Sequence, residues 1–189
     1  MNIARVIIGL FVTLIMATRA SADATNEFDA WSINTNGLQA RLILIEQPKL
    51  YGTRWLVPFL ELRNVRDLTS QMEVHCDRRH LRIELVDADG KVTRDGRFLN
   101  RSGAVTELNT IILPSDSSIR ISLECKNWGI QRDAAAMVCT DSGAWVIQES
   151  EKGKVYLRAT LTEEKSPTPP YWKVWYGTIQ TPLLKIDWK

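Results

Sequence analysis

The chain has 189 residues, of which 44% are hydrophobic and 24% charged, a composition that supports a packed core rather than a disordered chain. Its 24 basic residues nearly balance its 22 acidic ones, so it lacks the strong positive field on which nonspecific nucleic-acid binding draws. We therefore expect one globular domain and no nucleic-acid partner.

The N-terminus has the layout of a secretory signal peptide. Arg5 precedes an apolar run over residues 6–17, and the small residues Ala20, Ser21 and Ala22 follow it. The run is shorter than the roughly 20 apolar residues that a membrane span needs, and small residues suit signal peptidase. We predict cleavage after Ala22, with an uncleaved membrane anchor as the alternative.

Cleavage there defines the expected mature protein. It removes two arginines and no acidic residue, so the basic and acidic residues become equal in number and the net charge falls to zero. We expect a signal peptide over residues 1–22, a flexible N-terminus over 23–35 and a single domain over 36–189. The protein is then secreted or periplasmic, and its mature chain has no membrane span.

Two apolar stretches predict the first strands. Residues 38–45 alternate and become apolar on both faces towards their end, whereas residues 54–63 are apolar on both faces throughout, which is typical of a strand deep in a domain. Pro58 lies within the second stretch. Because proline cannot donate to a strand ladder, we expect a bulge or an edge at this point.

The clearest hairpin signal follows. Residues 81–85 alternate between apolar and charged side chains, and residues 87–90 supply Asp, Ala, Asp and Gly for a turn that returns through Lys91 and Val92. Period-two patterns recur over residues 119–123 and 155–161, and each predicts a half-buried strand.

The remaining segments are shorter. Residues 133–138 contain three consecutive alanines and predict at most one short helix. Residues 165–170 are rich in proline and favour an extended crossing between sheets. The apolar runs over 174–179 and 183–188 have too few residues for a core of their own, so we expect them to complete the main sheets.

Short strands separated by turn residues predict an all-β fold, an antiparallel β-sandwich, with a β-barrel as the alternative. At this level residues 36–188 resemble the immunoglobulin-like and fibronectin-like domains of secreted proteins. The antibody pattern places a buried tryptophan between two paired cysteines, whereas here Trp55 precedes all three cysteines. The resemblance therefore concerns architecture and transfers no functional residue.

Three cysteines occur in a chain expected to be exported, where a disulfide can persist. We favour a pair between Cys125 and Cys139, because a short closed loop of this size stabilises by about 3 kcal/mol in the chain-entropy model. The alternative is that Cys76, Cys125 and Cys139 are three buried thiols acting as small apolar residues.

Residues 75–80 hold the only two histidines of the chain, together with a cysteine and an aspartate. The candidate metal ligands are His75, Asp77 and His80, since imidazole and carboxylate both bind zinc or copper. In an extended segment only two ligands converge, and Arg78 and Arg79 oppose a cation. We therefore expect no metal site and no cofactor.

The seven tryptophans are the unusual feature of the composition. Trp128 adjoins a glycine, and Tyr171 and Trp172 follow the prolines, so these three are candidate ligand-binding residues exposed in loops. We expect Trp55, Trp145 and Trp175 in the core. Asn100 begins a glycosylation sequon, which is relevant only in a host that glycosylates exported chains.

The sequence contains no nucleophile elbow and no phosphate-binding loop. Glu163 and Glu164 are not a convergent pair of carboxylates, because neighbouring side chains point apart in a strand. No catalytic residue is therefore marked. We expect a non-catalytic binding or interaction module of the cell envelope or extracellular space, whose partner is an unknown protein or cell-surface polymer. The alternatives are a metal-dependent or hydrolytic enzyme using residues 75–80, and a structural component that self-associates through an open strand edge.

Overall fold

The computed structural model describes residues 30–50, 52–67, 71–76, 80–94, 110–123, 134–140, 143–165 and 174–188. These residues form twelve β-strands and one short 3-10 helix, η2 (Glu149–Glu151). The predicted all-β fold is confirmed.

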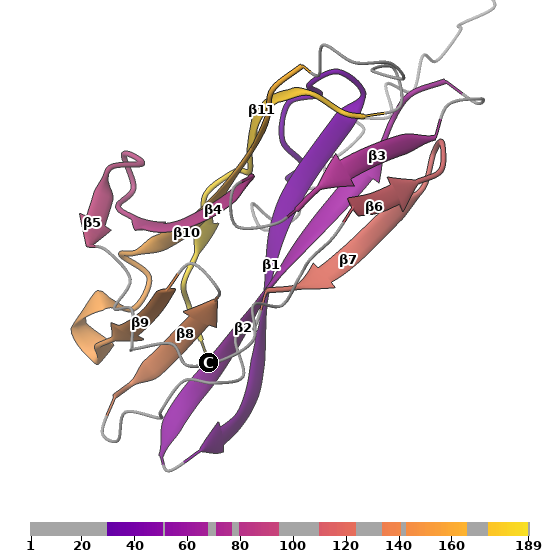
Figure 1. Ribbon diagram of the computed structural model, residues 1–189. Helices are drawn as coiled ribbons and strands as arrows, with labels where there is room; N and C mark the ends of the chain where they lie inside the picture. Colours follow the sequence, from indigo (N-terminus) through magenta and orange to yellow (C-terminus); the bar gives the residue numbers. More distant parts are fainter. Residues whose placement is uncertain are drawn as a thin grey trace, which may run out of the picture.

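The two longest strands of the first sheet, β1 (Leu38–Leu50) and β2 (Thr53–Asn64), are antiparallel and run through the middle of the molecule (Figure 1). On its other side, β2 pairs in parallel with β8 and antiparallel with β7, and β9 follows β8. The strands of this sheet are β1 (Leu38–Leu50), β2 (Thr53–Asn64), β7 (Ser118–Ser122), β8 (Ala136–Thr140) and β9 (Gly143–Ile147).

The second sheet is built around β10, which pairs with β4, β11 and β12, while β5 extends β4. Its strands are β4 (Leu81–Val86), β5 (Val92–Arg94), β10 (Tyr156–Glu163), β11 (Gly177–Gln180) and β12 (Leu184–Lys185). The predicted runs near the C-terminus therefore do complete a main sheet. A third, two-stranded sheet pairs β3 (Met72–His75) with β6 (Thr110–Leu113).

The core lies between the two large sheets, where β1 packs against β10, β11 and β12. Alternate residues of β10 face inward, as the period of two requires. Leu60 and Leu62 of β2 meet Leu157 and Leu161 of β10 in one continuous cluster, and Met72 and Val74 of the small sheet join it. The chain is thus a β-sandwich with a small third sheet beside its core.

Pro58 lies inside β2 rather than at an outer edge. The parallel pairing with β8 covers Arg54 to Leu56, and the antiparallel pairing with β7 begins at Phe59. Pro58 thus stands where one partner strand ends and the next begins. The bulge or edge that we expected at Pro58 is not present, because the pairing with β1 continues in register past it and β2 has partners on both sides. The missing N–H instead coincides with the change of partner from β8 to β7.

The hairpin of β4 and β5 forms as predicted. The Asp87 N–H donates to the Lys91 carbonyl (2.9 Å), and the Asp87 carboxylate accepts from the N–H groups of Asp89 and Lys91. Gly90 takes a positive φ of 78°, which a residue without a side chain adopts freely.

The helix expected near residues 133–138 is wrong over the residues described. Residues 136–140 form β8, and every one of their side chains is buried. Alanine favours a helix in isolation, but a strand that is covered on both faces and paired on both sides gains more from packing and ladder hydrogen bonds.

Residues 30–35 lie within the segment that we expected to be flexible, and part of it is held against β1. Ser32 exchanges hydrogen bonds with Ala40, and Thr35 pairs with Leu38 in both directions across a tight turn. Asn36 and Gly37 form this turn with positive φ values of 50° and 85°. Asn-Gly is the preferred pair for a two-residue hairpin turn, a signal that our sequence analysis overlooked.

Candidate functional site

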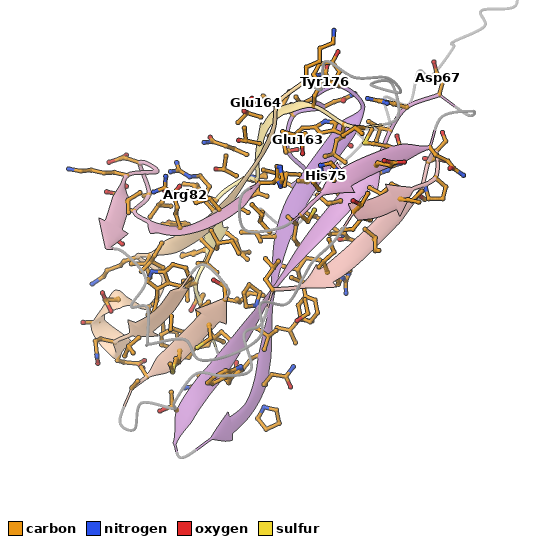
Figure 2. All side chains as sticks on the ribbon, viewed as in Figure 1. Asp67, His75, Arg82, Glu163, Glu164 and Tyr176 are labelled. Atoms are coloured by element: carbon orange, nitrogen blue, oxygen red, sulfur yellow. The ribbon has the colours of Figure 1, made fainter. Side chains whose placement is uncertain are left out.

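Three polar side chains meet where three strands begin or end. His75 is the last residue of β3, His80 immediately precedes β4, and Glu163 is the last residue of β10. Glu163 Oε2 lies 2.7 Å from His75 Nδ1 and 3.2 Å from His80 Nε2. The two imidazole centroids are 5.4 Å apart. Figure 2 shows His75 and Glu163 side by side at this junction.

The period of β10 explains why a carboxylate points here. Leu157, Ala159 and Leu161 face the core and are buried, and Glu163 continues the same face. At the end of the strand, the Glu163 side chain contacts the two histidines, whereas the earlier residues of this face pack in the apolar cluster. Glu164 follows outside the strand and is exposed, so the two neighbouring glutamates do point apart as expected.

Backbone hydrogen bonds hold the other two residues in place. The Thr162 N–H donates to the His80 carbonyl (2.8 Å), which attaches the start of β4 to the end of β10. The Trp175 N–H donates to the Glu73 carbonyl (2.8 Å), and His75 pairs with Thr110 of β6. The junction therefore positions side chains that are 88 residues apart in the chain.

All three side chains of the site are partly exposed. The side chain of Glu163 is 14% exposed, whereas those of His80 and His75 are 22% and 32% exposed. The carboxylate is thus the least exposed of the three groups, and the imidazoles reach the solvent.

The three donor atoms lie close enough together to approach a single metal ion. All three ligand atoms lie within 4.8 Å of one another, and this is the one such group of histidine, cysteine or acidic residues within the described residues. An ion held tetrahedrally by bonds of about 2.0–2.2 Å keeps its ligand atoms about 3.3–3.6 Å apart. The carboxylate must therefore move slightly away from His75, and the two imidazoles must close on the ion.

In the absence of an ion the same residues satisfy one another. Each imidazole can donate an N–H to the shared carboxylate, so Glu163 is not left as an unpaired, nearly buried charge. A metal ion would replace these N–H protons without requiring new positions for the strands.

The expectation of no metal site rested on the view that only two ligands converge from residues 75–80. Glu163 adds a third possible donor from a distant strand, which this reasoning did not consider. His75 and His80 are brought together, and Asp77 lies outside the described residues. The missed signal was an acidic residue that continues an apolar face of period two.

The other candidate residues divide into two groups. Trp128, Tyr171, Trp172, Asn100 and Cys125 lie outside the described residues, so the ligand-binding face, the sequon and the pair of Cys125 with Cys139 stay predictions. Within the described residues, Cys76 and Cys139 are both buried and no disulfide joins them. The expected core tryptophans, Trp55, Trp145 and Trp175, are confirmed as buried.

A search of the described residues for a helix long and apolar enough to cross a membrane finds none. Comparisons with protein-family models, with curated proteins and with solved structures found no match to this chain.

Proposed function

We propose that the protein is an exported, non-catalytic β-sandwich module that binds a divalent transition-metal ion through His75, His80 and Glu163. One observation carries the proposal: a single carboxylate oxygen lies 2.7 Å from one imidazole nitrogen and 3.2 Å from another. The carboxylate thus brings together the only two histidines of the chain, and all three groups are possible metal ligands.

The donor set narrows the choice of ion. Two imidazoles and one carboxylate suit zinc, copper, nickel or iron, whereas calcium and magnesium prefer oxygen ligands alone. Zinc imposes no geometric preference from its d electrons and tolerates unequal donor distances. We therefore propose Zn²⁺ as the first ion to test and Cu²⁺ as the competitor that the general affinity order favours.

The wider role that we propose is interaction with a protein or cell-surface polymer in the cell envelope or extracellular space. The signal-like N-terminus supports export, and the sandwich is compatible with the immunoglobulin-like or fibronectin-like modules that often perform such roles. Metal binding then gives this module a chemically defined ligand.

The test is calorimetric titration of the purified protein with Zn²⁺, comparing the native chain with Glu163→Gln and Glu164→Gln. Groups that only orient a ligand already change metal affinity about 10- to 100-fold, so replacing the ligand oxygen of Glu163 should weaken binding at least as much. Glu164 is the next residue and is exposed. Glu164→Gln removes the same charge from this exposed position and should leave the affinity nearly unchanged.

Two results would contradict the proposal. The native protein would bind no stoichiometric ion, or Glu163→Gln would bind it as tightly as the native protein. Circular dichroism of each variant shows whether the sandwich has folded, so a loss of affinity is not confused with a loss of structure.

A second candidate is a metal-dependent hydrolase. The observation that favours it is the donor set itself, because two histidines and one glutamate are the protein ligands of several catalytic zinc sites. Such an enzyme uses the ion to activate a bound water. Turnover of an activated ester by the zinc-loaded protein, abolished in His75→Ala, would favour the enzyme over the binding module.

A further inference from the structure

We infer that an ion bound by His75, His80 and Glu163 keeps a coordination position facing the solvent and binds a small anion there. This inference rests on the proposed metal binding and adds the ligand class that the loaded site takes.

The number of donors is the first argument. Within the described residues three donor atoms converge, and a tetrahedral or five-coordinate ion needs at least one more. Structural zinc sites use four protein ligands and are closed. Sites with three protein ligands take water or an exchangeable ligand in the remaining position.

Exposure gives the second argument. Leu161 precedes Glu163 on the same face of β10 and is 2% exposed, so the carboxylate borders the core. The His75 and His80 side chains are more exposed than that of Glu163, so solvent reaches the imidazoles. An ion held there is within reach of a dissolved ligand.

Charge gives the class of ligand. A divalent ion with two neutral imidazoles and one carboxylate retains one excess positive charge. In a half-buried site an unbalanced charge is costly, and an anionic ligand removes it whereas a neutral one does not. A carboxylate or another small anion is thus preferred to an amide of the same shape.

Cobalt provides a direct measurement, because Co²⁺ replaces zinc and its visible spectrum reports the number and type of ligands. We would first titrate the protein with Co²⁺ and establish one equivalent bound. The loaded protein would then be titrated with acetate and with azide, and separately with acetamide as the neutral match of acetate. The inference expects saturable spectral changes with both anions and none with acetamide.

The outcomes separate the two proposals. If Co²⁺ binds in one equivalent and the anions leave the spectrum unchanged, the inference is overturned while metal binding stands. If Co²⁺ does not bind, both fail. The variant Asp77→Asn gives a further arm: anion binding that appears only in this variant would mean that Asp77 closes the site, which also overturns the inference.

Discussion

Asn64 and Glu163 occupy equivalent positions in the two large sheets, yet their surroundings differ. Each is the last residue of a central strand, β2 or β10, and each continues the strand's core face beyond its last leucine. Asn64 is fully buried, its Nδ2 donates to the Leu113 carbonyl (3.1 Å), and its Oδ1 accepts from the Arg66 N–H (3.0 Å). Glu163 is partly exposed and contacts two imidazoles.

The difference distinguishes a structural polar group from a candidate ligand-binding one. Asn64 pairs with backbone groups where β2 meets the end of β6, so its partners are fixed by the fold. The partners of Glu163 are side chains that can exchange a proton for a metal ion. Changes near Asn64 should therefore alter stability alone, and changes at Glu163 should alter binding.

The largest effect on stability is expected from the leucines that precede both residues on the core face. Leu62→Ala and Leu161→Ala each remove a buried side chain and leave a cavity, so each should lower the free energy of unfolding by about 3 kcal/mol. Urea denaturation measures both losses. A much smaller loss for Leu161→Ala would mean that the core near the proposed metal site relaxes into the cavity. The ends of β2 and β10 would then no longer be equivalent in packing.

The next effect concerns Asn64. Asn64→Ala leaves the buried Leu113 carbonyl and the half-buried Arg66 N–H without this partner, and we expect a loss of about 2 kcal/mol in the free energy of unfolding. Zinc affinity of the folded variant should stay unchanged. If zinc affinity fell together with stability, the two strand ends would be coupled and the distinction between them would be lost.

A smaller effect is expected at Gly37, next to the Asn64 region. Gly37 has a φ of 85°, and a Cβ there would collide with the side chain of Arg66, whose Nε donates to the Asn36 carbonyl (3.0 Å). Gly37→Ala should cost about 1 kcal/mol or slightly more, from backbone strain and displacement of Arg66. Thermal unfolding measures the change, and an unaltered melting temperature would show that the turn relaxes freely.

The smallest effect on the metal-free protein is expected from Glu163→Gln, below about 1 kcal/mol, because the amide keeps the size of the side chain and can still accept a hydrogen bond. The variant should differ from the native protein in how much Zn²⁺ raises the free energy of unfolding. At an ion concentration 100 times the dissociation constant, binding stabilises the native protein by about 2.7 kcal/mol. Thermal scans with and without Zn²⁺ test this, and an equal zinc-induced shift in both proteins would refute the role of Glu163.

The strands that the sequence predicted well have either a clear period of two or a long apolar run. Residues 38–45, 81–85, 119–123 and 155–161 alternate, residues 54–63 are apolar on both faces, and all five stretches correspond to strands. Strands β3, β6, β8 and β9 were not predicted. They have five residues or fewer, and β8 is buried on both faces, so no alternation marks it.

The candidate site was predicted only in part for a related reason. His75 and His80 were recognisable as chemistry-bearing residues because they are near neighbours in the chain. Glu163 was considered only beside Glu164, since no rule of spacing links it to a histidine 88 residues earlier. The Asn36-Gly37 turn, in contrast, was a local signal that could have been used.

By itself the sequence determined the class of this protein: a chain with an export-signal pattern whose alternating apolar residues require stacked β-sheets. Local patterning carries that information because successive side chains of a strand lie on opposite faces of the sheet. Only the tertiary structure decided that β8 is a strand, that Pro58 lies at a change of partner, and that Glu163 meets two histidines. Those results depend on which distant strands lie together, and long-range pairing is settled by packing of the whole core.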